Sequence, residues 1–196
     1  MVHGCHVIWG TYGFWLPNDP RGSWSDVVDS WDLARFGKAT RHARSGDRHE
    51  WQAWRDRVAM ALKFPAVRFS GVQAHSVGTG FANAVRKCKF TVWACSILPE
   101  HVHLVIARHV YPVERVCIQL KGEATKQLRA ESRHPLSEFE KNGKLPSLWG
   151  EKQWKVFLDN NEAIQNAVRY VEENPVKEGK PRQRWSFVTP FSGVAQ

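Results

Sequence analysis

The chain has 196 residues, a length that fits one domain with a sizeable hydrophobic core or one domain carrying an insertion. Its 28 Lys and Arg against 19 Asp and Glu leave a net charge of +9, which with ten tryptophans favours a nucleic-acid partner, although basic patches also serve solubility or acidic membranes. No apolar run approaches the roughly 20 residues of a membrane span, and the four cysteines form no Cys-x-x-Cys pair. These features indicate a cytoplasmic protein without membrane association, rather than a secreted disulfide scaffold.

The first third of the chain is expected to hold a short strand, an insertion and a helix. The strand covers Cys5 to Trp9, where β-branched and aromatic residues precede a turn-rich segment. Residues 23–64 are charged, rich in tryptophan and weakly patterned, so we interpret them as an insertion that either clamps substrate or is a surface excursion. A helical pattern follows over 70–87 and is interrupted by Gly78 and Gly80.

The rest of the chain is expected to hold three strands and two helices before a basic tail at 180–196. In order, the elements are a buried strand over 90–97, a strand at 101–107 joined to it by a tight turn, a helix over 112–131, a strand over 153–158, and a helix from Asn160 or Asn161 to Glu173. This order predicts a single α+β domain with the ferredoxin-like βαββαβ arrangement, one antiparallel sheet and an added C-terminal helix. The first and third strands are central in that arrangement.

Two histidines, His101 and His103, lie two residues apart within the third strand. Side chains alternate faces along a strand, so both imidazoles are expected on one face, where they can hold one divalent cation. The alternative is that the two histidines bind no metal and are only the polar edge of a half-buried strand. Two further histidines, His6 and His109, are expected to be solvated or to cap local turns.

The last helix carries a tyrosine, Tyr170, away from its predicted buried stripe. With Ile164 as zero, Tyr170 lies at about 240° and Asn174 at about 280° around the helix axis. Asn174 is one turn further on, so its amide and the tyrosine hydroxyl can address the same point. Pro175 is expected to end the helix there.

Phosphodiester transfer is the chemistry that suits this set. A tyrosine hydroxyl has a pKa near 10 and is a poor nucleophile unless the phosphate that it attacks is polarised. A cation held by the histidines would polarise that phosphate, and the products would be a covalent phosphotyrosine and a free 3′-hydroxyl. No Gly-rich phosphate loop, Ser/His/Asp set or zinc-type cysteine cluster competes with this interpretation.

Two blocks resemble those of a known superfamily. Leu98-Pro99-Glu100-His101-Val102-His103-Leu104-Val105 resembles the His-hydrophobe-His block of single-tyrosine HUH transposases (IS200-like). Arg169-Tyr170-Val171-Glu172-Glu173-Asn174-Pro175-Val176-Lys177-Glu178-Gly179 is similar to the tyrosine helix of the same superfamily, in particular of the REP-associated tyrosine transposases. The segment from Trp9 to Pro17 also looks like a recurring opening among these proteins.

The resemblance implies a role for each matched residue. His101, His103 and Asn174 would bind Mg²⁺ or Mn²⁺, with Glu173 and Glu100 as fallback ligands, and Tyr170 would be the nucleophile. The implied fold is the HUH endonuclease fold, and the implied substrate is single-stranded DNA bearing a REP-like hairpin, in a nucleoid-associated bacterial protein. Whether the tyrosine serves its own metal site or that of a second copy in a homodimer stays open.

Six basic residues are candidate phosphate contacts, and two aromatic residues in the tail could either stack on bases or pin the tail to the sheet. The basic residues are Lys121, Lys126, Arg129, Arg169, Arg182 and Arg184, and the aromatic ones are Trp185 and Phe187. Three functions remain: a DNA strand transferase, a domesticated hairpin-binding protein without productive transposition, and a metal-dependent RNase that uses activated water. The intact set of two histidines and a tyrosine favours the first.

Overall fold

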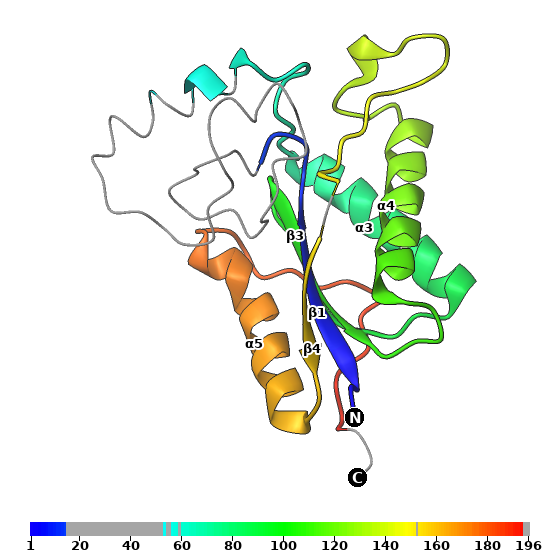
Figure 1. Ribbon diagram of the computed structural model, residues 1–196, viewed down its shortest axis with the longest axis vertical. Coiled ribbons are helices and arrows are strands. Elements are labelled where there is room, and N and C mark those ends of the chain that lie inside the picture. Colours follow the sequence, from blue (N-terminus) through cyan, green and yellow to red (C-terminus); the bar gives the residue numbers. More distant parts are fainter. Residues whose placement is uncertain (15–52, 54–55, 59, 152, 194–196) are drawn as a thin grey trace.

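The computed structural model describes residues 1–14, 53, 56–58, 60–151 and 153–193. A four-stranded antiparallel sheet forms its middle layer, with two helices on one face and one helix on the other (Figure 1). No helix among these residues is long and apolar enough to cross a membrane.

The strands are β1 (Gly4–Gly10), β2 (Val92–Ile97), β3 (His101–Ala107) and β4 (Trp154–Leu158), arranged in the order β2-β3-β1-β4. The two central strands β1 and β3 are therefore the first and third, as predicted for the βαββαβ arrangement. β1 is buried along its length and β3 at all but its two end residues, because both faces of the sheet are covered.

The helices on the first face are α3 (Gly71–Cys88) and α4 (Val113–Ala130), and α5 (Asn161–Lys177) covers the second. Ser70 begins α3 with a capping box, because its hydroxyl accepts from the Gln73 N–H while the Gln73 side chain accepts from the Ser70 N–H. Asn160 caps α5 by accepting from the Ala163 N–H. The expected starts of these helices are confirmed.

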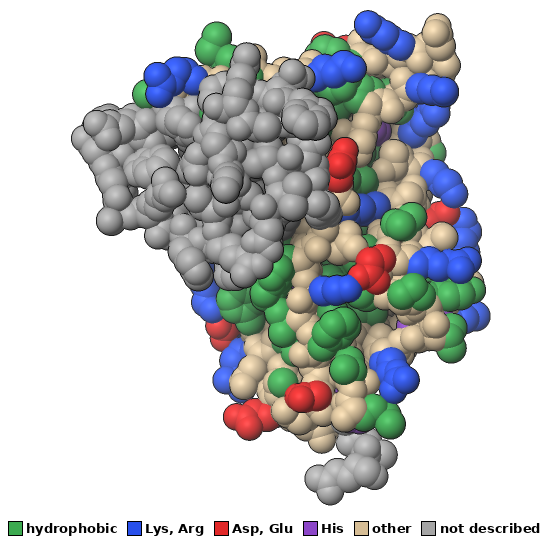
Figure 2. All heavy atoms as spheres, viewed as in Figure 1, with side chains coloured by type: hydrophobic (Ala, Val, Ile, Leu, Met, Phe, Trp, Pro, Cys, Tyr) green, Lys and Arg blue, Asp and Glu red, His purple; other side chains and the backbone are tan. Residues whose placement is uncertain are grey.

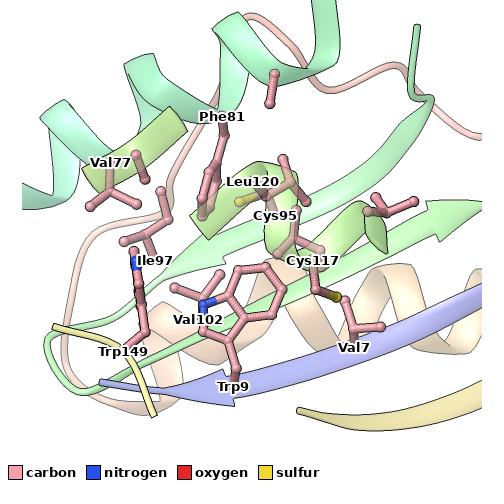
Figure 3. Packing of buried hydrophobic residues seen from close by; sticks show 14 of the residues in the cluster. Val7, Trp9, Val77, Phe81, Cys95, Ile97, Val102, Cys117, Leu120 and Trp149 are labelled. Carbon is pink, nitrogen blue, oxygen red and sulfur yellow. The ribbon is translucent and has the colours of Figure 1, made fainter. Parts of the chain in front are cut away.

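The larger hydrophobic core fills the space between the sheet and the α3/α4 layer (Figure 3). Val7 and Trp9 of β1 point toward Phe81 of α3 and Leu120 of α4, and all four side chains are fully buried. Gly80 lies where α3 crosses α4: a Cβ there would stand 2.4 Å from the Ala124 Cα. The two glycines expected to interrupt α3 instead let it pack closely, Gly80 against α4 and Gly78 against the ring of Trp185.

The described part of the tail packs along β2. The Gln183 side chain accepts from the Ile97 N–H and donates to the Ile97 carbonyl, at 2.8 and 2.7 Å. Phe187 is buried in the larger core, and Trp185 stacks on it. Of the two roles considered for these aromatic residues, the structure shows the one that pins the tail to the sheet.

Two expectations require correction and one lies outside the described residues. α5 does not end at Asn174 but continues through Pro175 to Lys177. Pro175 lacks the N–H that would bond to the Val171 carbonyl, but so near the end of the helix only this one bond is lost, and the Glu178 and Lys180 N–H groups close the turn after it. The segment 132–150 is less loop-like than expected, because it contains a 3-10 turn, η1 (Ser137–Phe139), and buries Leu148. The insertion predicted over 23–64 lies mostly outside the described residues.

Candidate active site

The register between β1 and β3 decides which side chains share a face. Ile8 is opposite His103 and Gly10 is opposite His101, so His6, two residues from Ile8, lies on the same face as both β3 histidines. That face is covered by α5. Three imidazoles therefore gather between two central strands and one helix.

His101 and His103 lie with ring centroids 4.9 Å apart and ring planes at 72°. His103 is 4% exposed, and its burial, followed by the nearby His101 and His6, holds its pKa far below the usual value. His103 is consequently neutral at neutral pH, and a neutral imidazole has a lone pair available for a cation. The same-face arrangement expected from the His-x-His spacing is present.

His6 was expected to be solvated or to cap a turn, and this expectation is wrong. The side chain is 8% exposed, and its Nε2 lies 3.2 Å from the Nδ1 of His103. Burial lowers the pKa of His6 to about 4, so it too is neutral at neutral pH. His6 lies at an even spacing from Ile8 and Gly10, so these three residues share a face of the first strand. Only the pairing of β1 with β3 shows that this is also the face of His101 and His103. His109, by contrast, accepts a hydrogen bond from the Tyr111 N–H, as a turn cap does.

Tyr170 comes from α5 and lies against the histidines. Its ring centroid is 5.7 Å from that of His103 and 5.8 Å from that of His6, and both pairs meet edge to face. The side chain is 45% exposed, so its hydroxyl is accessible to a large substrate, in keeping with the flank position predicted from the helical angle. The Lys177 ammonium, which the sequence analysis did not consider, lies 5.3 Å from the centre of the same ring.

Asn174 lies one turn after Tyr170 and faces inward. It is 8% exposed, and its Nδ2 makes no hydrogen bond among the described residues. A buried amide without a partner is costly, and such groups in native proteins often serve a ligand. Ser96 repeats the pattern on the same face of the sheet. It is opposite His103 in the register of β2, and its buried hydroxyl makes no hydrogen bond to any residue that the structure describes.

Glu178, just after α5, is the carboxylate that the sequence analysis missed. Its Oε1 lies 3.6 Å from the Nε2 of His101, because the helix runs on past Pro175 and brings its C-terminal cap to the start of β3. The two fallback ligands are directed elsewhere: Glu100 pairs with Arg68 at 2.6 Å, and Glu173 pairs with Lys177 at 3.1 Å.

The Gly10–Phe14 segment also contacts His101. The Phe14 ring stacks on the His101 ring at 4.9 Å and 16°, and a Cβ at Gly10 would stand 2.9 Å from Phe14. Thr11 fixes the turn before β3, since its N–H donates to the Glu100 carbonyl at 2.8 Å and its hydroxyl lies 2.7 Å from the Val67 carbonyl and 3.0 Å from that of Glu100. The described part of the N-terminal block thus has a structural role at the site. Its remainder, from Trp15 to Pro17, lies outside the described residues.

The residues present fit a divalent cation with mixed nitrogen and oxygen ligands. Two imidazoles, an amide that has no hydrogen-bond partner among the described residues and a nearby carboxylate suit Mn²⁺, and the oxygen groups suit Mg²⁺. Within the described ranges, no group of three or more His, Cys, Asp or Glu is placed to hold a metal ion. Among the described residues, the groups nearest to a third ligand are the buried amide of Asn174 and the Glu178 carboxylate beside His101.

The six candidate phosphate contacts do not lie together. Three of them are on α4, on the far side of the sheet from Tyr170, where Lys and Arg side chains line that edge of the molecule in Figure 2. Lys121 is turned inward, with its ammonium 2.9 Å from the Gly150 carbonyl, while Lys126 pairs with Glu123 and Arg129 with Glu140. Arg169, Arg182 and Arg184 are exposed, and Arg169 immediately precedes Tyr170.

Comparison with known proteins gives similar solved structures only. A REP-associated tyrosine transposase bound to a REP hairpin matches with a TM-score of 0.49 and 15% identity, covering 100% of this chain and 93% of that one. A candidate transposase from Deinococcus radiodurans R1 matches with a TM-score of 0.42 and 12% identity, covering 92% of each chain. No family model and no curated protein matches the sequence.

Proposed function

We propose that the protein is a metal-dependent single-stranded DNA endonuclease and strand transferase in which Tyr170 is the nucleophile. The observation that carries this proposal is the contact of the Tyr170 ring with His103, which brings together two segments far apart in the sequence. A half-exposed tyrosine against two buried neutral histidines is an arrangement that a structural core does not need.

His101, His103 and Asn174 would hold Mg²⁺ or Mn²⁺, which when bound polarises the scissile phosphate and stabilises charge on the leaving oxygen. The Tyr170 hydroxyl attacks phosphorus, so a new bond forms between phosphorus and the tyrosine oxygen while the bond to the 3′ oxygen breaks. The tyrosine proton passes to solvent and the 3′ oxygen takes one up, which leaves a 5′-phosphotyrosine and a free 3′-hydroxyl. Lys177 lies beside the ring, and opening of its ion pair with Glu173 would let its ammonium bind the phosphate.

The substrate that we propose is single-stranded DNA with a REP-like hairpin. The support is the net charge of +9, the resemblance of the two sequence blocks, and the hairpin held by the REP-associated transposase described above. The alternative is a domesticated hairpin-binding protein, which would need the basic surface but neither the histidine pair nor the tyrosine.

Covalent trapping tests the proposal. The full chain is incubated with a 5′-labelled and a 3′-labelled hairpin oligonucleotide in Mn²⁺ and analysed under denaturing conditions. We expect a protein–DNA adduct that retains only the 3′ label, no adduct with Tyr170→Phe, and none with His101→Ala/His103→Ala. Tyr111→Phe is the matched control and should trap normally, because Tyr111 lies at the far end of β3 beside His109.

Each other outcome has a distinct meaning. Cleavage by Tyr170→Phe at the wild-type rate would show that water is the nucleophile and would contradict the proposal. Hairpin binding without any adduct, equal in wild type and all variants, would support the domesticated binding protein instead.

A further inference from the structure

His6 contacts the proposed metal ligand His103 but has no role in the chemistry proposed above. Its Nε2 lies 3.2 Å from the Nδ1 of His103, and the two rings are stacked with centroids 5.4 Å apart and planes at 27°. The two rings come from neighbouring central strands. Among the described residues, this is the hydrogen bond available to the His103 ring.

One hydrogen atom between these two nitrogens decides what His103 can do. A neutral imidazole carries its proton on one nitrogen and a lone pair on the other. If His6 donated, the His103 Nδ1 would accept, and the His103 proton would be on Nε2, where it blocks a cation. If His103 donates from Nδ1, its Nε2 carries the lone pair and is free to bind.

We propose that His6 is a positioning residue that accepts the Nδ1–H of His103 and thereby holds His103 in the tautomer whose Nε2 carries the lone pair that a cation would need. The inference rests on the proposed function, in which His103 is a metal ligand. Metal-binding histidines as a rule donate their other N–H to a carboxylate, carbonyl or water, which fixes the tautomer and the ring orientation. Here a second imidazole has that role.

The surroundings hold the His6 ring in place for this task. Tyr170 and Trp154 pack edge to face on it, with centroids at 5.8 and 6.3 Å, and His103 stacks on it. A ring held by three aromatic neighbours cannot turn away without disturbing them. His6 thus connects the orientation of the metal ligand to the position of the tyrosine.

His101 is oriented by different means. Its ring stacks on Phe14, and its Nε2 faces the Glu178 carboxylate. Loss of His6 should therefore affect His103 directly and His101 only slightly. This difference makes the two ligands separable by experiment.

The test uses three variants of the full chain. His6→Gln keeps an oxygen that can accept the Nδ1–H, His6→Leu removes the acceptor at similar volume, and His109→Leu is a control for the loss of a histidine away from the site. Affinity for Mn²⁺ is measured without DNA by electron paramagnetic resonance. The tautomer of His103 is measured without metal by long-range ¹H–¹⁵N NMR.

We expect wild-type His103 to be protonated at Nδ1. His6→Gln should keep this tautomer and bind Mn²⁺ within about threefold of wild type, whereas His6→Leu should lose the tautomer and bind about 10- to 100-fold more weakly. His109→Leu should match wild type. His103 protonated at Nε2 in the wild type, or wild-type Mn²⁺ affinity in His6→Leu, would overturn the proposal.

Failure of this inference is distinguishable from failure of the proposed function. If His101→Ala/His103→Ala abolishes Mn²⁺ binding but His6→Leu does not weaken it, only the positioning role is wrong. If the double variant binds Mn²⁺ like wild type, the metal site itself is wrong. Should His6→Leu fail to fold, the wild-type NMR measurement and His6→Gln still decide the matter.

Discussion

The two faces of the sheet carry different kinds of side chain, although the same strands supply both. On β1, Val7 and Trp9 face the α3/α4 layer and belong to the larger core, whereas His6 faces α5. On β3, Leu104 faces the α3/α4 layer and His103 faces α5. The alternation of side chains along a strand therefore places the larger core on one face, whereas the α5 face holds the histidines beside a smaller apolar cluster that includes Val105 and Ile164. The larger core and the histidines should be alterable independently.

The largest expected difference between the faces is their response to acid. In the metal-free folded protein, burial lowers the pKa of His6 from 6.5 to about 4. Between pH 6.5 and pH 4 the unfolded chain therefore binds a proton at this residue that the folded chain does not bind. Stability is complete above pH 6.5 and falls as the pH drops, by about 3 kcal/mol at pH 4 for His6 alone. Urea denaturation of wild type and His6→Gln in EDTA measures this: the variant should lose less stability between pH 7 and 4. Equal losses would show that the imidazole is not kept neutral by the fold.

The packed face should respond to a single methyl group. Gly80→Ala places a Cβ against the Ala124 backbone and should lower the free energy of unfolding by about 1–3 kcal/mol. Gly122→Ala is the matched control on α4, because a Cβ there meets nothing within 4 Å and should stabilise the helix by about 0.5–1 kcal/mol. Covalent trapping per folded molecule should be unchanged in both variants, and thermal unfolding measures the difference. A stable Gly80→Ala would show that the helices do not cross this closely.

The smallest expected effect is on hairpin binding, and it should differ between a basic residue on α5 and one on α4. Arg169→Ala, next to the tyrosine, should weaken hairpin binding about threefold to tenfold and reduce the salt dependence by about one released counterion. Lys126→Ala should change little, because Lys126 is on α4 and pairs with Glu123. Fluorescence anisotropy over a range of salt concentrations measures both. The opposite ranking would place the DNA over α4.

The elements of the fold could be predicted because their signals are local. The capping box at Ser70 and the asparagine cap at Asn160 mark where helices begin, and the alternation in β3 fixes which residues share a face. The βαββαβ order then gave the positions of the central strands. The His101–His103 pair and Tyr170 lie where these local signals placed them.

The residues that were missed depend on contacts between distant segments. His6 gains its position only from the register of β1 with β3, and Glu178 only because α5 continues past Pro175. Lys121 looked like a free cation on a helix face, but its ammonium bonds to the Gly150 carbonyl of a loop whose path the sequence does not indicate. A single sequence shows the spacing of residues along one element and not which element will pack beside it.

The contact of the tail with β2 has a consequence for self-association. Because Gln183 and Thr189 occupy backbone groups on the outer side of β2, that strand cannot readily add a strand from another molecule. Within the described residues, nothing pairs with the outer side of β4, so a second chain that extended the sheet would have to approach there. Lys155 on that strand is paired with Glu114, and a charged pair at an open edge discourages indiscriminate strand addition. Among the described residues, β4 is thus the edge of the sheet that is open to a further strand, and the Lys155–Glu114 pair lies on it.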